Sequence, residues 1–230
     1  MQDDQQTDES SPETEDAATA SAEPSAGRRL GKMRGAGTAV TEGETDTAQQ
    51  EMPFAYVDGK VYAIGGRGYE AGRIFVYDVA KKSWSIARFS NPDPRSSGAA
   101  VVVGHSIYLI GGLDSHGASS RVDILDVSRG VFRRGPALPV VREGHVAALV
   151  DGKIHVTGGQ SISPPKSYAD HFVLDLTSDK WSREAPLPTA RHGSVAAGAH
   201  GKFFVIGGAP GAGVYTVFTS SDVVDIYSNK

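Results

Sequence analysis

The most regular feature of the chain is a short apolar run that ends in two consecutive glycines and occurs four times. The four runs cover residues 61–64, 107–110, 154–157 and 203–206. They lead into the pairs Gly65-Gly66, Gly111-Gly112, Gly158-Gly159 and Gly207-Gly208, spaced by 46, 47 and 49 residues. A period of this length is the signature of a repeat architecture in which each unit is one supersecondary motif.

Each repeat carries the signals of four short strands. The first is small and apolar, the second is the run into the glycine pair, the third ends near an aspartate, and the fourth begins near a large aromatic residue. The expected aspartate markers are Asp78, Asp126, Asp175 and Asp225. Short strands, glycine-containing turns and no helical period predict an all-β array of four four-stranded units, the last of them incomplete. Their approximate boundaries are 49–94, 95–141, 142–190 and 191–230.

Two further markers keep the same phase. A large aromatic residue follows each of the first three aspartates by six residues: Trp84, Phe132 and Trp181. A Pro-x-x-Arg segment ends at Arg95, Arg142 and Arg191, each 16 residues before the next glycine pair. With the glycine pairs, these residues resemble the kelch repeats of β-propellers over residues 49–230. The resemblance implies blades arranged radially, with the first strand at the central channel and the fourth outermost.

The residue sizes fit such an array. Adjacent sheets crowd together near the axis, where the first strands carry alanine and glycine, and they diverge outward, where Trp84, Phe132 and Trp181 fill the gap. The paired glycines end the second strand where a Cβ would meet a neighbouring backbone. We therefore expect the glycine pairs and the three aromatics to be structural.

Ring closure is the open question of this fold. Kelch propellers commonly close with more blades than four, and the lead-in expected before the first blade is replaced by Gln49 at the arginine position. A compressed ring, an open arc and a piece of a larger propeller are all compatible with the sequence. We expect an open or partial propeller whose apolar end faces lead to self-association.

Composition separates residues 1–48 from the rest. The first 50 residues hold 11 acidic against 4 basic residues and none of the 18 aromatics, so we expect a disordered acidic tail. Its basic residues form a small cluster: Arg28, Arg29, Lys32 and Arg34. The chain has no cysteine and a net charge of −4. We expect no disulfide, no nucleic-acid or membrane partner and, with neither a leader nor a spanning segment, a soluble, by default cytoplasmic protein.

The candidate site lies where the loops between the second and third strands (the B-C loops) meet the connectors that lead into the first strands. The arginines at positions 95, 142 and 191 would stand there as a partial ring suited to a carboxylate. The alternative is that each arginine bridges neighbouring blades. The full set of predicted binding residues is Arg95, Arg142, Arg191, Arg67, Tyr69, His116, His145, His192, Tyr215 and Phe218.

The predicted function is a non-catalytic binding module whose protein partner docks on the B-C loop face through an acidic segment. The histidines share no repeat position, so we expect no catalytic residue, metal or cofactor. The alternative is an acidic-sugar binder or an enzyme like the sialic-acid mutarotases, which belong to the family that the chain resembles. The copper chemistry of galactose oxidase, another kelch-like protein, is excluded because it depends on a cysteine.

Overall fold

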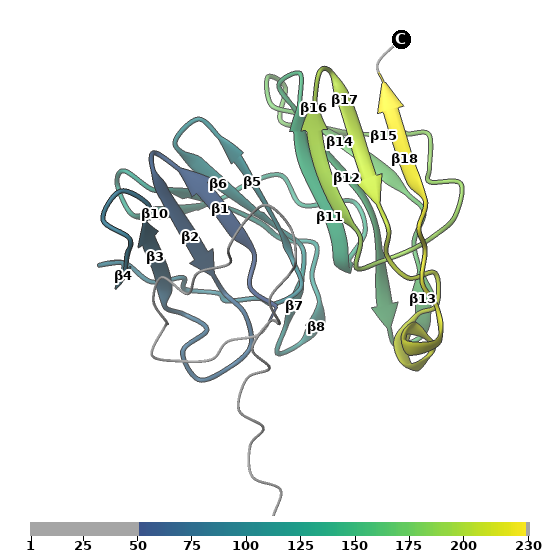
Figure 1. Ribbon diagram of the computed structural model, residues 1–230, viewed down its shortest axis with the longest axis horizontal. Coiled ribbons are helices and arrows are strands. Elements are labelled where there is room, and N and C mark those ends of the chain that lie inside the picture. Colours follow the sequence, from purple (N-terminus) through teal and green to yellow (C-terminus); the bar gives the residue numbers. More distant parts are fainter. Residues whose placement is uncertain (1–50, 229–230) are drawn as a thin grey trace, which may run out of the picture. The chain divides into compact units, whose positions relative to one another are not determined.

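A computed structural model describes residues 51–228 of the chain (Figure 1). The predicted acidic tail and its basic cluster lie outside these residues. The first sheet is β1 (Phe54–Val57), β2 (Lys60–Ile64), β3 (Ile74–Asp78) and β4 (Ser83–Ile86). The second is β5 (Ala99–Val103), β6 (Ser106–Ile110), β9 (Val122–Asp126) and β10 (Val131–Arg134).

The third sheet is β11 (Glu143–Val150), β12 (Lys153–Ile162), β14 (His171–Asp175) and β15 (Lys180–Glu184), with β13 (Pro165–Ser167) added to β12. The fourth contains β16 (Val195–Ala199), β17 (Lys202–Ile206) and β18 (Val224–Ser228). A two-stranded ribbon, β7 (Leu113–Asp114) with β8 (Gly117–Ala118), and a 3-10 helix, η1 (Gly213–Phe218), lie in the loops. Every sheet is an antiparallel meander, so the prediction of an all-β array of four propeller blades, with an incomplete fourth, is confirmed.

The first strands of neighbouring blades lie against each other, β1 with β5, β5 with β11 and β11 with β16. A chain of main-chain hydrogen bonds joins them at one end: Ser97 N donates to Glu51 O, Gly144 N to Ser97 O and Gly193 N to Gly144 O. These four residues all have positive φ, between 53° and 64°. The small residues of the first strands therefore sit where the backbones of adjacent blades are closest.

The core lies in the gaps between blades. One apolar cluster joins the first and second blades and has Phe132 packed on it, and a second joins the second and third blades and has Trp181 packed on it. Trp181 Nε1 also donates a hydrogen bond to Pro136 O at 3.0 Å. Phe132 and Trp181 thus each fill the gap to the preceding blade. Trp84, in the first blade, lies instead against Tyr77 of the same sheet, with ring centroids 5.2 Å apart.

The aspartate marker predicted for the fourth blade, Asp225, is misaligned by three residues. Lys60, Ser106 and Lys153 pair with Asp78, Asp126 and Asp175, but in the fourth blade the equivalent Lys202 pairs with Ser228. Asp225 is therefore the counterpart of Asp123 rather than of Asp126. The glycine pair alone could not reveal this, because the loop that contains η1 differs in length from the other B-C loops.

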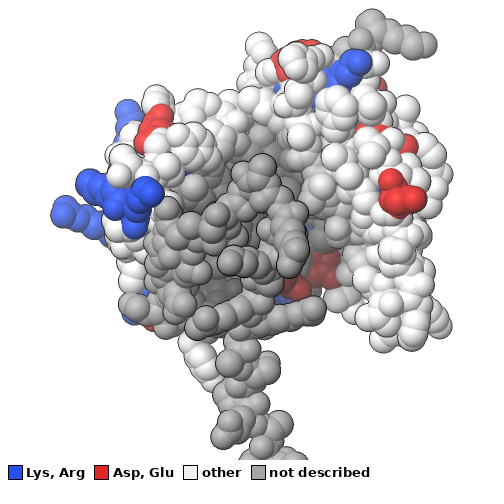
Figure 2. All heavy atoms as spheres, in the orientation of Figure 1, with Lys and Arg blue, Asp and Glu red and all other residues white. Residues whose placement is uncertain are grey.

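The arc is open within residues 51–228. No contact comparable to those between neighbouring first strands joins β1 to β16 in this range. The outward face of the fourth blade exposes aliphatic side chains at Val195, Ile206, Val224 and Ile226. On the first blade, Phe54, Tyr56 and Ile86 are exposed. Figure 2 shows a mostly uncharged surface over β16, β17 and β18.

Candidate functional site

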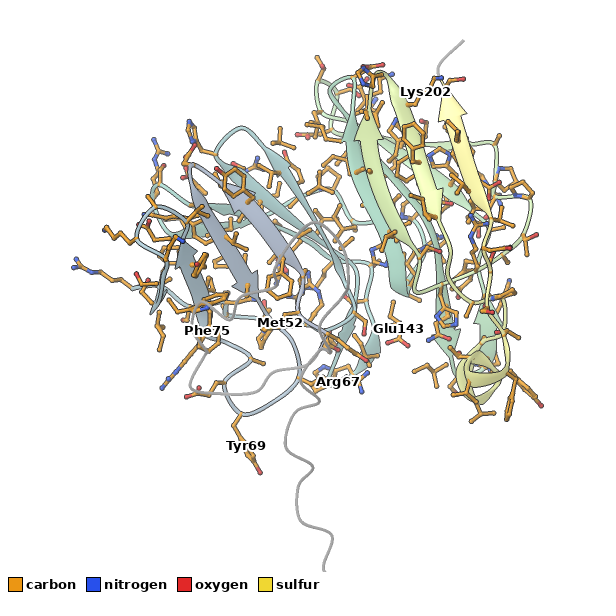
Figure 3. All side chains as sticks on the ribbon, viewed as in Figure 1. Met52, Arg67, Tyr69, Phe75, Glu143 and Lys202 are labelled. Carbon is orange, nitrogen blue, oxygen red and sulfur yellow. The ribbon has the colours of Figure 1, made fainter. Side chains whose placement is uncertain are left out.

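The B-C loops gather at one end of the blades. Figure 1 shows β7, β8, β13 and η1 at this end. Figure 3 shows Arg67, Tyr69 and Glu143 there, and Lys202, at the start of β17, at the other end. This follows from the meander. The turns between the first and second strands (A-B) and between the third and fourth strands (C-D) lie at one end of each sheet, so the B-C loops lie at the other. We call this end the B-C loop face.

The three Pro-x-x-Arg arginines are buried between the blades. The exposed fractions of Arg95, Arg142 and Arg191 are 6%, 0% and 1%, so the prediction that they form an accessible ring is wrong. Their guanidinium groups donate to the carbonyl of the first glycine of their own blade's pair, at Gly111, Gly158 and Gly207, over 2.7–2.9 Å. Their own carbonyls accept from the second glycine of the preceding blade, at Gly66, Gly112 and Gly159. Each arginine therefore links two neighbouring blades, as the alternative in the sequence analysis predicts.

Carboxylates in contact with the three arginines balance these charges. Asp123 accepts from Arg95 at 2.5 Å, and it also accepts from Arg121 and Arg134. Burial alone would raise the pKa of Asp123, but the hydrogen bonds from Arg95 and Arg121 lower it overall. Arg191 pairs with Asp225 at 2.7 Å. Burial lowers the pKa of Arg142 to about 10, against the attraction of Asp170, so this side chain is still charged at neutral pH.

The predicted histidines separate into two kinds. His145 is buried against the first glycine of the second blade's pair, and burial lowers its pKa to about 3. His192 is also buried, and its Nε2 lies 2.7 Å from Gly211 O and 3.1 Å from Thr216 Oγ1, so it holds the loop of η1. Both side chains are therefore buried rather than presented on the surface. His116 stands exposed in the β7–β8 ribbon beside Asp114.

A polar group at the mouth of the arc was missed by sequence reasoning. Glu143 is 3% exposed, and its burial raises the pKa of its carboxyl group. Gln160 Nε2 donates weakly to Glu143 Oε1 at 3.4 Å, while Gln160 Oε1 accepts from Gly213 N at 3.0 Å. Arg67 Nε lies 3.2 Å from both Glu51 Oε2 and Ser96 Oγ. The signal in the sequence is a glutamate at the start of a first strand whose other residues, apart from His145, are small or apolar.

The B-C loop face has a groove and an exposed apolar rim. The groove, of about 330 Å³, is lined by Leu113, His116, Val141, Glu143, Ile162 and Ser163 among others. The rim is carried by three different loops, and its exposed apolar side chains are Tyr69, Ile162, Val214, Tyr215, Val217 and Phe218. Figure 3 shows Tyr69 projecting away from the sheets. None of the residues of η1 is buried, and Phe218 is 82% exposed.

Across residues 51–228, no group of three or more histidine and acidic side chains is placed to hold a metal ion. In the same part of the chain, no helix is long and apolar enough to cross a membrane.

Four meandering blades linked by buried arginines define a β-propeller built from sequence repeats. Residues 51–228 match the family model of the KLHDC2/KLHL20/DRC7 Kelch-repeats domain. The chain therefore belongs to the kelch-repeat family, and the predicted resemblance is confirmed.

Similar proteins share parts of this region. A putative F-box/kelch-repeat protein of Arabidopsis thaliana is 50% identical over 70 residues, which are 30% of this chain and 20% of that protein. Kelch-like protein terF of Aspergillus terreus is 30% identical over 160 residues, 62% of this chain and 34% of terF. Kelch-like protein 35 of Mus musculus is 30% identical over 105 residues, 44% of this chain and 17% of that protein. The matched part of the chain thus spans about a third or less of the length of these relatives.

Proposed function

We propose that this kelch domain is a non-catalytic protein-interaction module that binds its partner on the B-C loop face. The observation that carries the proposal is the exposed apolar rim, because side chains such as Tyr215 and Phe218 extend into solvent and cover no core. Exposed apolar groups gathered on one face are typical of interaction sites. The family, which includes kelch-like relatives, supports the same class of function.

The chemistry of this face favours an apolar partner segment over an acidic one. Of the arginines predicted to bind an acidic partner, Arg95, Arg142 and Arg191 are buried, and Arg67 is already paired with Glu51. An acidic segment would have to displace that carboxylate. Tyrosine and phenylalanine anchors supply binding energy through burial instead. The same burial removes the arginine ring with which the acidic-sugar alternative would bind a carboxylate.

The test compares two variants of the full chain as bait in affinity capture with quantitative mass spectrometry. Tyr215→Ser combined with Phe218→Ser is expected to lower the recovery of specific partners by about tenfold, because it removes two aromatic anchors. Val79→Ser is the control, since Val79 is also exposed but follows β3 in the C-D turn, at the other end of the blade. Equal recovery with all three baits would contradict the proposal.

We also propose that the chain self-associates through its open blade faces. The fourth blade exposes Val195, Ile206, Val224 and Ile226, an apolar set that a soluble monomer rarely shows to water. In sedimentation velocity of the full chain, we expect the average mass to rise with concentration. Val224→Lys with Ile226→Lys should keep the chain monomeric, whereas Val131→Lys, on the exposed outer strand β10, should not. A wild-type chain that is monomeric at all concentrations would rule this out.

A further inference from the structure

The groove on the B-C loop face contains a buried carboxylate among apolar side chains. Its volume is about 330 Å³, and its walls come from the second and third blades. Leu113 belongs to the β7–β8 ribbon, Val141 precedes β11, Glu143 begins β11 and Ile162 ends β12. Val141 and Ile162 are 46% and 49% exposed, so the apolar wall is open to solvent. Of the described residues that line the groove, Glu143 alone is acidic.

One carboxylate oxygen of Glu143 has no partner. Glu143 is 3% exposed, and its Oε2 atom accepts no hydrogen bond within residues 51–228. Its Oε1 atom receives only the long contact of 3.4 Å from Gln160 Nε2. Arg67 does not neutralise it, because the guanidinium group of Arg67 contacts Glu51 and Ser96 instead. An unpaired buried carboxylate oxygen is unfavourable, so the groove is suited to a ligand that brings a charged donor.

The other blades satisfy the side chain at this position. The residue after the Pro-x-x-Arg arginine is Ser96 in the second blade, Glu143 in the third and His192 in the fourth. Ser96 Oγ accepts from Arg67 Nε at 3.2 Å, and His192 Nε2 lies 2.7 Å from Gly211 O. Each of these two side chains is therefore held by a neighbouring B-C loop. Glu143 lines the groove with one oxygen unused.

The groove combines the two surfaces that a lysine side chain needs. A lysine packs its aliphatic stem against apolar groups while its ammonium group keeps a polar contact. The apolar lining residues supply the first surface, and Glu143 Oε2 supplies the acceptor. The hydroxyl oxygens of Ser161 and Ser163, which also line the groove, can accept the remaining ammonium protons. Arginine fits less well, because its planar fork pairs with both oxygens of a carboxylate and Gln160 already approaches Oε1.

We propose that this groove binds a lysine side chain of the protein partner, in a segment that carries aliphatic residues beside the lysine. The ammonium group pairs with Glu143 Oε2, and the stem lies between the β7–β8 ribbon and the end of β12. The inference rests on the proposed function, because Ile162 belongs both to the groove and to the exposed apolar rim. It adds a charge requirement that the rim alone does not impose.

The probe is a random peptide library displayed on phage, selected in parallel on the full wild-type chain and on its Glu143→Gln variant. Glutamine keeps the size of glutamate and an oxygen for Gln160, so this change removes only the charge. We expect the wild-type chain to enrich peptides with a lysine beside aliphatic residues, and the variant to lose this enrichment. Glu51→Gln is the matched control, because it removes the same charge from a residue that pairs with Arg67 and does not line the groove. This control should keep the lysine preference.

Fluorescence anisotropy of a selected, fluorescein-labelled peptide then measures the lysine contact itself. Replacing the lysine of the peptide by methionine, which is also unbranched but uncharged, is expected to weaken binding to the wild-type chain about tenfold. The same two peptides should bind Glu143→Gln with similar affinities, because that variant has already lost the charge pair. No lysine enrichment, equal binding of both peptides to the wild-type chain, or a lysine effect that persists in Glu143→Gln would overturn the proposal.

The stability of Glu143→Gln checks that the carboxylate is unpaired in the free protein. Burial raises the pKa of Glu143, and Glu51 adds to this shift while the charges of Arg67 and His192 oppose it. A raised pKa means that the fold disfavours the ionised carboxylate. Neutralising Glu143 should therefore leave the urea midpoint unchanged or raise it, whereas a structural ion pair would lose stability. A clear fall in the midpoint would contradict the proposed site.

The variant Tyr215→Ser with Phe218→Ser separates this inference from the proposed function. A selected peptide that loses affinity for this variant but not for Glu143→Gln would support docking on the apolar rim and overturn the lysine site. A peptide with the opposite pattern would support the lysine site and contradict the role of the two aromatic anchors. Loss of affinity in both variants would support both proposals.

Discussion

Replacing Asp123 by asparagine is expected to lower the free energy of unfolding by about 3 to 5 kcal/mol. The carboxylate of Asp123 accepts from Arg95 at 2.5 Å, and Arg121 and Arg134 also donate to it. Arg95 is 6% exposed, so its charge would stay buried without a counter-ion. Urea unfolding followed by tryptophan fluorescence measures the change.

Asp93 provides the matched control for this experiment. It lies 3.2 Å from Arg121 and 2.8 Å from Arg134, but its side chain is far more exposed than that of Asp123. Asp93→Asn should therefore cost less than about 1 kcal/mol. Adding Arg95→Met to Asp123→Asn should recover part of the loss, because the orphaned charge is then removed. If the two asparagine variants are equally stable, Asp123 is not the anchor described here.

Gly65→Ala is expected to destabilise the protein by about 4 kcal/mol, from backbone strain and steric overlap together. Gly65 has a φ of +80°, and a Cβ at this position would lie 2.3 Å from the carbonyl oxygen of Arg95. That same oxygen accepts the hydrogen bond from Gly66 N that joins the first two blades. The added methyl group can be accommodated only by moving this link.

Gly59 separates the two contributions, since its φ is +78° and a Cβ there would meet no atom within 4 Å. Gly59→Ala should cost about 1 to 2 kcal/mol, the strain of the left-handed backbone alone. Chemical unfolding of both variants under the same conditions gives the comparison. Equal losses of unfolding free energy at the two positions would mean that the contact with Arg95 does not contribute to the destabilisation.

The sequence alone identified the repeats, the strands and the kelch family because these depend on local patterns. Alternation sets the faces of a strand, glycine and aspartate set the turns, and small or large residues mark the inner and outer strands. These signals recur at one period, so errors in one blade are corrected by the others. The predicted register of the fourth blade was wrong because its B-C loop differs in length from the others. Asp225 was therefore matched to Asp126 instead of Asp123.

Only the tertiary structure decided which charged residues are accessible. An arginine before a strand has the same local sequence pattern whether it faces water or the neighbouring blade. The burial of Arg142 depends on contacts with Gly158 and Asp170, which lie far along the chain. The pairing of His155 Nδ1 with His171 Nε2, and of His171 Nδ1 with Ala185 O, likewise depends on strands that meet only in the folded blade. Local pattern determines the blades, whereas the packing between blades determines what remains available for binding.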